Sequence, residues 1–558
     1  MIARTLLLAS LSLASVAVAQ EAPRPPLPSA ETNARVNAAL PEAEAAMKAH
    51  VMFLASDAML GREAGSPTYD VAAQYVAAQY YAAGLRPAGD NGSYLQTVPL
   101  VSYKPASQGS FGWTPKGGAA QPLTFGEDYL PGADPTQAQT RVDAPVVFVG
   151  YGIDAPTFKR NDYAGVDVRG KVVAFFSGAP AAMPGEERAH FGNAANKAVT
   201  AQAKGAVGVI LLESPTSAKV RPFSRLAETW NSARMTWAEA DGTGFFAAPK
   251  TPSLGTVSMK GAEKMFAGAR TPWAQVVAAA ESPAAKFRAV ELPGRLSVQL
   301  STETKPVTSY NVAGLLPGSD PKLKDEIVVL TAHLDHVGVG TPKNGDAIYN
   351  GAMDNAVGIA SLIEEAKRFK AAGAAPKRSV LFLAVTAEEK GLVGADYFAR
   401  HPTFPKANLV ADVNLDMPIL TYKFEDIVAF GADRTTLGQY VKNAAAKMNL
   451  QISPDPMPDQ GFFVRSDHYR FVQQGIPSVF VWPGTKGPGK AAFDAFLSTH
   501  YHQPSDEVGQ TPPIDWSSGV RFIEANYSIA REIADAPERP RWNKGDFFGT
   551  LYNGLGAK

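Results

Sequence analysis

Cysteine is absent from this chain of 558 residues. Without it the chain has no disulfide bridge, no thiolate nucleophile, no cysteine-ligated zinc site and no lipidated cysteine anchor. The chain also lacks net charge, because 53 basic residues balance 53 acidic ones, which argues against nucleic acid or an anionic membrane as the main partner. Histidine is scarce, with eight copies. Stability must therefore come from buried apolar side chains and from any metal that the chain binds.

Apolar runs of about 20 residues, the length that spans a bilayer, are missing as well. The apolar run Leu6–Val16 is shorter, and it lies between Arg4 and the small residues Ala17-Val18-Ala19. This order predicts a cleaved signal peptide over residues 1–19, with an uncleaved anchor as the alternative. We expect export to the periplasm or the medium, and no membrane attachment after cleavage.

The length exceeds what one hydrophobic core supports, since chains split into domains beyond roughly 250–300 residues. Between residues 135 and 297, short β-rich runs alternate with glycine, proline and one helical stretch. From about residue 298 the pattern becomes strand, loop and helix in repetition. The predicted divisions are a signal peptide at 1–19, the first part of the main domain at 20–134 with a proline-rich linker at 20–32, an inserted module at 135–297, the rest of the main domain at 298–540 and a C-terminal tail at 541–558.

Five apolar, largely β-branched runs are predicted to be strands of the main domain. Their near-continuous hydrophobicity suits strands that are buried on both faces of a sheet. The amphipathic segments 355–373 and 435–449, which lie between such runs, suit helices that cover the sheet. The alternation predicts an α/β fold, a three-layer sandwich with a mostly parallel central sheet. The predicted strands are 326–332, 379–385, 409–415, 426–432 and 477–483.

Metal-capable side chains follow three of these strands. The stretch VLTAHLDHVG, residues 329–338, ends its strand with two histidines and an aspartate. Acidic residues follow the next two strands, and a further aspartate precedes a predicted helix. Because the carboxyl ends of parallel strands meet at one edge of the sheet, we expect these side chains to converge. The candidates are His333, Asp335, His336, Asp354, Glu388, Glu389, Asp416 and His502.

Each candidate also has a purely structural interpretation. Asp354 would cap a helix, and Glu389 would form a capping box with Thr386. His333 would be a hydrogen-bonded core histidine, and His502 a surface loop residue. The convergence of strand ends favours a site, because the structural interpretation needs all of these coincidences together.

The chemistry of the candidate set indicates metal binding. Imidazoles and carboxylates without sulfur suit Zn²⁺, Mn²⁺ or Co²⁺. Two histidines and three carboxylates are too many for one tetrahedral zinc, but they suit two ions that share a bridging carboxylate. A hydrolytic centre then needs a further carboxylate, free of metal, to carry a proton. The adjacent pair Glu388 and Glu389 offers one carboxylate for each purpose.

Several motifs occur in a fixed order along the chain: HLDHVG, NGAMDNAVG, TAEEKGLVGADYF, NLDM, SDHYRFVQQGIPSVFV and YHQPSDE. In this order the chain resembles the secreted bacterial di-zinc aminopeptidases, relatives of glutamate carboxypeptidase and the transferrin receptor. The segments NDYAGVDVRGKVVAFFSG and AKGAVGVILL resemble the protease-associated (PA) domain that many members carry. The resemblance covers nearly the whole mature chain and implies a zinc exopeptidase fold with an inserted, β-rich PA domain.

The resemblance also implies a role for individual residues. Glu388 would be the general base, Asp335 would orient the imidazole of His333, and Tyr501 would hydrogen-bond the developing oxyanion. The peptide bond after Asp354 is expected to be cis. The implied metal ligands are His333 and Asp416 for one zinc, Glu389 and His502 for the other, and Asp354 for both. His336, Asp467, His468 and His500 receive no assigned role, although Asp467 and His468 belong to a motif beside the family's pocket.

The function expected from the resemblance is that of a di-zinc metallo-aminopeptidase, which removes N-terminal residues from peptides or proteins with a free N-terminus. Mn²⁺ or Co²⁺ are possible substitutes for the two Zn²⁺ ions. A carboxypeptidase or a glutaminyl cyclase of the same superfamily is the alternative within the resemblance. A peptide-binding or receptor-like protein without catalysis is the alternative from another class. The sequence leaves open the side-chain preference and the oligomeric state.

Overall fold

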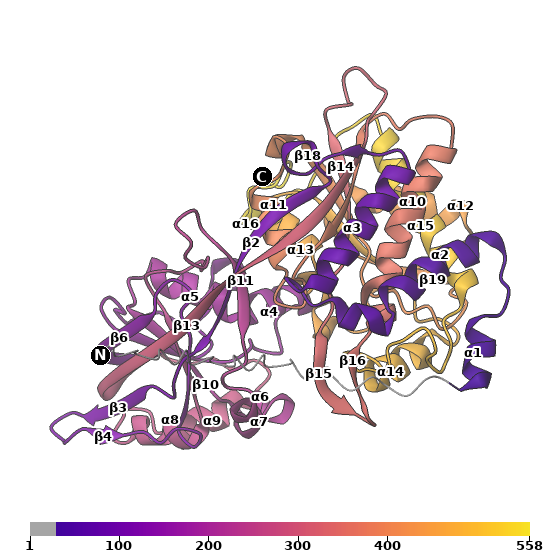
Figure 1. Ribbon diagram of the computed structural model, residues 1–558. Helices are drawn as coiled ribbons and strands as arrows, with labels where there is room; N and C mark the ends of the chain where they lie inside the picture. Colours follow the sequence, from indigo (N-terminus) through magenta and orange to yellow (C-terminus); the bar gives the residue numbers. More distant parts are fainter. Residues whose placement is uncertain (1–28) are drawn as a thin grey trace, which may run out of the picture.

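The computed structural model describes residues 29–558, which form a larger and a smaller body (Figure 1). The predicted signal peptide, residues 1–19, and most of the predicted linker lie outside the described residues. The first described helix, α1 (Ala30–Val36), begins after Ser29, whose hydroxyl accepts a hydrogen bond from the N–H of Thr32. Among residues 29–558, no helix has both the length and the apolar character needed to cross a membrane.

Four parallel strands form the centre of the larger body. In the order β17, β14, β18 and β21 they pair side by side, and all of their residues are buried. The strand β19 (Asp426–Phe430) runs antiparallel to β21, and β20 (Gln451–Ile452) pairs parallel with β19 at the edge. The bounds of the central strands are β14 Ile327–His333, β17 Ser379–Val385, β18 Leu409–Asn414 and β21 Ser478–Pro483. The five predicted strands and the mostly parallel sheet are therefore confirmed, with ends shifted by no more than two residues.

Helices cover both faces of this sheet. Successive strand residues point to opposite sides, so a strand whose residues are all apolar gives the sheet two apolar faces to bury. Along β14, Val328 and Leu330 pack into the main core, whereas Ile327 and Val329 pack into a second core across the sheet. This alternation produces the three predicted layers. The helices on the main-core side are α2 (Glu42–Leu54), α3 (Pro67–Ala82), α10 (Val357–Ala371), α12 (Leu437–Lys447), α14 (Gly489–Thr499) and α15 (Trp516–Asp535), and those on the other side are α11 (Val393–Arg400) and α13 (His468–Val472).

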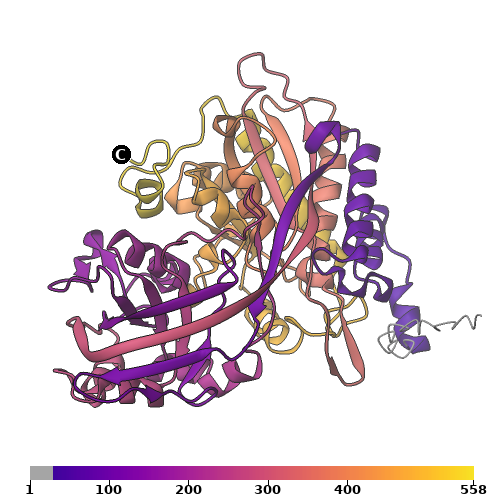
Figure 2. The same ribbon diagram turned by 60° about the vertical axis from the view of Figure 1, so that its left-hand side comes forward.

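One long strand, β13 (Val290–Leu316), runs through both bodies, and Figure 2 shows it as a continuous ribbon. Its second half pairs antiparallel with β2 (Leu95–Pro105) and β17 in the larger body. Its first half pairs antiparallel with β3 (Ser110–Pro115) and β6 (Gln139–Phe148) in the smaller body. The two bodies are therefore joined by continuous main-chain hydrogen bonding, which a flexible linker would not provide. Shorter strands of this region are β1 (Arg86–Pro87), β11 (Arg234–Trp237), β15 (Gly338–Lys343) and β16 (Asp346–Tyr349).

The smaller body is a second α/β unit with its own apolar cores. Its strands β6, β9, β10 and β12 are parallel neighbours. Its strands come from residues 110–301, a wider segment than the predicted insertion at 135–297, and the division into domains stays a prediction. The remaining bounds are β4 Gln121–Pro122, β5 Tyr129–Pro131, β7 Asp154–Ala155, β8 Arg160–Asn161, β9 Val172–Phe176, β10 Gly208–Leu212, β12 Ser253–Val257, α4 Gly185–Gly192, α5 Ala194–Ala203, α6 Pro215–Val220, α7 Phe223–Glu228, α8 Met259–Phe266 and α9 Trp273–Ala280.

An arginine ties the two bodies to the C-terminal segment. The guanidinium of Arg434, in the larger body, contacts the carboxylates of Glu186 and Glu187 on α4, the latter at 2.9 Å. It also lies 3.0 Å from the carboxylate of Asp546, which caps the helix α16 (Phe547–Leu551). Residues 541–558, expected to be a tail, are thus packed against the larger body, where Trp542 is buried.

Candidate metal centre

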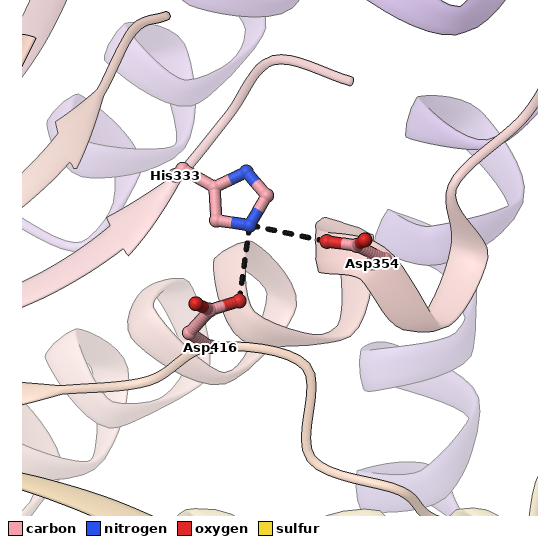
Figure 3. A group of neighbouring side chains, drawn as sticks. All are labelled: His333, Asp354 and Asp416. Atoms are coloured by element: carbon pink, nitrogen blue, oxygen red, sulfur yellow. Dashed lines mark hydrogen bonds and ion pairs between the residues drawn. The ribbon is translucent and has the colours of Figure 1, made fainter. Parts of the chain in front are cut away.

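The parallel strands bring the sequence candidates to one edge of the sheet. His333 is the last residue of β14, Asp416 lies two residues after β18, and Glu388 and Glu389 lie in the turn after β17. Since β17, β14 and β18 are neighbours in that order, these side chains come from adjacent strand ends. Asp354 approaches from the turn before α10. Figure 3 shows one nitrogen of His333 facing both Asp354 and Asp416.

The first group of donors is His333, Asp354 and Asp416. The Nε2 atom of His333 lies 3.0 Å from Oδ1 of Asp416 and 3.2 Å from Oδ1 of Asp354. Ligands of a tetrahedral zinc with bonds of about 2.0–2.1 Å lie about 3.3–3.4 Å apart. The separations therefore fit a single ion, and all three side chains are buried.

The second group of donors faces the other oxygen of Asp354. Nε2 of His502 lies 3.3 Å from Oδ2 of Asp354 and 3.1 Å from Oε2 of Glu389. On another side, Nδ1 of His336 lies 2.7 Å from Oε1 of Glu389 and 4.0 Å from Oδ2 of Asp354. Asp354 thus turns Oδ1 to the first group and Oδ2 to the second. This is the arrangement in which one carboxylate bridges two ions.

The loop around Asp354 is held in place by hydrogen bonds between side chains and main-chain groups. Both carboxylate oxygens of Asp506 accept N–H groups, from Met353 at 2.8 Å and from Asp354 at 3.0 Å. The peptide bond between Asp354 and Asn355 is cis, as the resemblance implied. The side chain of Asn355 then donates to the carbonyl of Leu415, next to Asp416, at 2.9 Å. The candidate bridging carboxylate is therefore fixed to the strand end that carries its neighbour.

Asp335 contacts His333, but by a route that the sequence did not indicate. The ring atom Nδ1 of His333 lies 3.1 Å from the main-chain carbonyl of Asp335. The carboxylate of Asp335 instead accepts the N–H groups of Glu388, at 3.0 Å, and of Glu389, at 3.3 Å. The main-chain carbonyl of Asp335 thus takes the place beside Nδ1 that the sequence assigned to its carboxylate. Asp335 therefore positions the two glutamates as well as the histidine.

Electrostatics keep the candidate ligands of the second group ionised. Burial and Asp354 raise the pKa of Glu389, but the imidazoles of His336 and His502 outweigh them and lower it to about 2. Burial likewise raises the pKa of Asp354, and the contacts of its carboxylate with His333 and His502 bring it well below its ordinary value. Ionised carboxylates are the form that binds metal.

Glu388 and Tyr501 line the open side of the centre. A cavity of about 50 Å³ is lined by Glu388, Tyr501 and the donors of the first group, together with aromatic side chains such as Trp482. Burial raises the pKa of Glu388 well above its ordinary value, although His333 opposes this shift. The ring of Tyr501 stacks on the ring of His502 with 4.0 Å between centroids. Of the three predicted catalytic residues, Glu388 and Tyr501 therefore border the cavity, and Asp335 is not among its lining residues.

Three residues of the centre were missed by the sequence reasoning. The hydroxyl of Ser466 donates to Oδ2 of Asp416, and Asn414 donates to that hydroxyl at 2.6 Å. Arg62 is fully buried, and its guanidinium donates to the main-chain carbonyls of Leu334 at 2.8 Å and Gly351 at 2.7 Å. Ser466 precedes two residues that did receive attention, whereas no local pattern marks Arg62. The third is Arg465, which is exposed and lines the cavity.

The remaining candidates of the sequence stay outside the centre. Asp467 and His468 are buried, and their side chains have no hydrogen-bond partner among residues 29–558. His468 packs between the rings of Phe463 and Phe480. The ring of His500 faces the carbonyls of Ser505 and Thr511, away from the donor groups. Neither Asp467, His468 nor His500 borders the cavity.

The donor set fits two transition-metal ions. Apart from His502 its side chains are buried, and it contains imidazole nitrogens and carboxylate oxygens. It brings together carboxylates that would repel one another without a cation between them. Asp354 belongs to both groups, which matches a pair of ions better than a single one. His333 and Asp416 stand on one side of it, and Glu389, His502 and His336 on the other.

Comparison with known proteins places this region in a family. Residues 311–528 match the family described as Peptidase family M28. This segment holds every candidate metal ligand, together with Glu388 and Tyr501. The match confirms that the region belongs to a peptidase family, as its motifs predict.

Named relatives match over part of their length. A "probable leucine aminopeptidase 2" of Aspergillus oryzae is 26% identical over 292 residues, which cover 48% of this chain and 54% of the relative. A "Leupeptin-inactivating enzyme 1" of Streptomyces exfoliatus is 31% identical over 174 residues, which cover 30% of this chain and 35% of the relative. The chain thus spans about half or less of the length of these relatives.

A solved structure covers more of the chain at lower identity. The "Aminopeptidase from Aneurinibacillus sp. strain AM-1" covers 89% of this chain and 95% of its own, with 20% identity and a TM-score of 0.49. Such an identity does not define the roles of single residues, which come from the geometry described above.

Proposed function

We propose that this chain is an exported di-zinc metallo-aminopeptidase, which hydrolyses the first peptide bond of peptides with a free N-terminus. The observation that carries the proposal is Asp354, whose two carboxylate oxygens face two separate groups of donors. The match to a peptidase family supports it.

The two groups divide the metal binding between them. His333 and Asp416 would hold one Zn²⁺, Glu389 and His502 the other, and Asp354 both. Mn²⁺ or Co²⁺ would suit the same donors. When bound, such a pair of ions supplies Lewis-acid activation of water and of the scissile carbonyl. Proton transfer and stabilisation of the oxyanion are then carried out by side chains of the protein.

Glu388 is the proton carrier of this proposal. Its carboxylate borders the cavity and is free of contacts with the imidazoles of the second group, unlike that of Glu389. It takes a proton from water and delivers it to the leaving amine. Tyr501, on the same cavity, donates a hydrogen bond to the developing oxyanion. Asp335 holds the main chain of the glutamate turn in place during these steps.

In this proposal, the part of a bound peptide that follows its first residue lies in a cleft between the two bodies. This cleft has a volume of about 520 Å³ and continues from Glu388, Glu389 and Tyr501. Its other wall includes Trp237 and Phe245, which stack with 4.2 Å between centroids, and Asn193 and Asn196 of the smaller body. The smaller body therefore limits which peptides reach the centre, while the carboxylates at its closed end attract the free α-amine.

Arg465 gives a specific reason to keep carboxypeptidase activity as a second candidate. It lines both the small cavity and the cleft, and it is exposed. A guanidinium at that place would bind the C-terminal carboxylate of a peptide. The free N-terminus of an aminopeptidase substrate needs no such partner.

A set of matched peptides separates the two candidates. The purified protein is loaded with Zn²⁺, its metal content is measured, and one peptide sequence is offered free, N-acetylated or C-amidated. We expect about two zinc ions per chain, hydrolysis of the free and amidated peptides and none of the acetylated peptide. Hydrolysis of the acetylated peptide with loss on amidation would establish the carboxypeptidase instead. Two zinc ions without hydrolysis of any peptide would favour a binding protein.

Export to the periplasm or the medium is also part of the proposal. It depends on the predicted signal peptide, residues 1–19, which precedes the described residues. N-terminal sequencing of the exported protein should find a start at or near Gln20. Exported protein that still begins at Met1 would contradict it.

A further inference from the structure

His336 lies beside the proposed second metal site, although the family resemblance gives it no role. It follows β14 by three residues, and its side chain is fully buried. Its Nε2 has no hydrogen-bond partner among the described residues, and the polar contacts of its Nδ1 are with carboxylates of the proposed site. A fully buried imidazole that faces carboxylates in this way suits a metal ion held between them.

The ring of His336 is aimed at the carboxylates of that site. Its Nδ1 lies 2.7 Å from Oε1 of Glu389 and 4.0 Å from Oδ2 of Asp354. One donor atom from each of these three residues lies within 4.8 Å of the other two, a spacing that admits a shared ion. His502 approaches the same two carboxylates from another direction, and the two imidazole rings lie edge to face with 5.7 Å between centroids.

The position of the ring depends on a glycine. Gly351 has a φ of 61°, and a Cβ added there would lie 2.5 Å from Cγ of His336. The ring therefore occupies space that any side chain at position 351 would fill. The buried guanidinium of Arg62 fixes this wall, because it donates to the carbonyls of Gly351 and Asn350. Packed against that wall, the imidazole faces Glu389 and Asp354.

We propose that His336 is a further ligand of the second metal ion, an inference that rests on the proposed di-metal centre. The second site then has four side chains: His336, Asp354, Glu389 and His502. The first site has three: His333, Asp354 and Asp416. A site that is filled by four protein ligands is of the structural kind, whereas one with three keeps a position open for water or substrate. The second site is thus the tighter one and fills first.

A measurement on the unaltered enzyme tests the ligand count. X-ray absorption at the zinc edge of the fully loaded protein reports the average number of imidazoles per ion. With His333, His502 and His336 as ligands, three imidazoles on two ions give an average of about 1.5. An average of about 1.0 with two ions bound would overturn the proposal and leave the di-zinc function intact. Protein that binds no zinc would instead refute the proposed function itself.

Variants test which ion depends on His336. Chelator competition on His336→Ala should show one class of zinc site weakened by at least about 10–100-fold, with the other unchanged. In Co²⁺-loaded protein, the visible absorption of the first equivalent should change as well, because its coordination sphere loses a nitrogen. Added imidazole should restore both properties in His336→Gly. Unchanged affinities and an unchanged Co²⁺ spectrum in either variant would show that His336 only packs against the centre.

The matched control is His50→Ala. His50 is also buried, and its Nε2 lies 2.9 Å from a glutamate, Glu364, which is outside the metal centre. Removing this imidazole should leave both zinc affinities and the Co²⁺ spectrum as they are. An equal loss of zinc in the control would attribute the effect of His336→Ala to general destabilisation and overturn the proposal.

Discussion

The two adjacent glutamates should fail in different ways when each loses its charge. Both main-chain N–H groups donate to the carboxylate of Asp335, so the turn is held without either glutamate side chain. The carboxylate of Glu389 lies between two imidazoles, 2.7 Å from His336 and 3.1 Å from His502. The side chain of Glu388 borders the cavity. Replacement by glutamine keeps the shape of each side chain and removes one charge.

The expected magnitudes follow from these positions. Glu388→Gln removes the proton carrier and should lower kcat by about 10²–10⁴-fold, which corresponds to about 2.7–5.4 kcal/mol in the barrier. Glu389→Gln removes a side chain that binds the metal directly. Changes to residues that only contact such a ligand already lower metal affinity by about 10–100-fold. The loss should therefore be at least about 1.4–2.7 kcal/mol, for one ion only.

Metal analysis and steady-state kinetics on both variants distinguish the two roles. Glu388→Gln should bind two ions, retain its KM and turn over slowly. Glu389→Gln should bind one ion at zinc concentrations that saturate the unaltered protein, and should regain activity as zinc is raised. Loss of zinc from Glu388→Gln, with full occupancy in Glu389→Gln, would reverse the roles. Full metal content and full activity in both variants would refute the assignment of this turn to the active site.

Three further changes test the first metal site, the contact between the two bodies and a buried lysine of the smaller body. Ser466→Ala removes the hydroxyl that donates to Asp416 and should weaken zinc binding at the first site by about 10-fold, measured by chelator competition. Arg434→Met removes the cation between the two bodies and should cost about 1.5–3 kcal/mol of local stability, seen as faster hydrogen exchange at residues 185–192 with unchanged metal content. Burial lowers the pKa of Lys197 to about 7, so the unfolded chain holds a proton that the folded chain has released between pH 7 and 10.5. Stability should therefore rise with pH in that window by up to about 1.4 kcal/mol per unit, and urea unfolding of Lys197→Met should lack this part of the slope.

The sheet and most of the candidate centre were predictable because both depend on local pattern. Runs of buried β-branched residues mark the strands, and in a parallel sheet the residues after each strand share one edge. That reasoning brings His333, Glu389 and Asp416 together before any distance is known. Asp354 and His502 lie outside strands, so the strand pattern does not bring them into the site, and the family resemblance supplied their roles as metal ligands.

Residues whose role depends on distant parts of the chain were not predictable. Arg62 donates to carbonyls at Leu334 and Gly351, more than 270 positions away, and nothing near it in the sequence marks that contact. The smaller body also takes β3 (Ser110–Pro115), because that strand pairs with β13 far along the chain. Its composition gave no sign of that partner, and the predicted insertion, residues 135–297, does not include it.

Charge balance explains why so many acidic groups are tolerated in the centre. The side chains of Asp335, Asp354, Asp416 and Glu389 are buried together, and the buried guanidinium of Arg62 donates its hydrogen bonds to main-chain carbonyls. The arginine thus fixes the loops, and its positive charge acts on the carboxylates from a distance. It neutralises no carboxylate by direct contact. Two divalent ions would supply the missing positive charge at the atoms that need it. The same loops that Arg62 holds carry Asp354 and shape the wall behind His336, so folding and metal binding depend on one set of contacts.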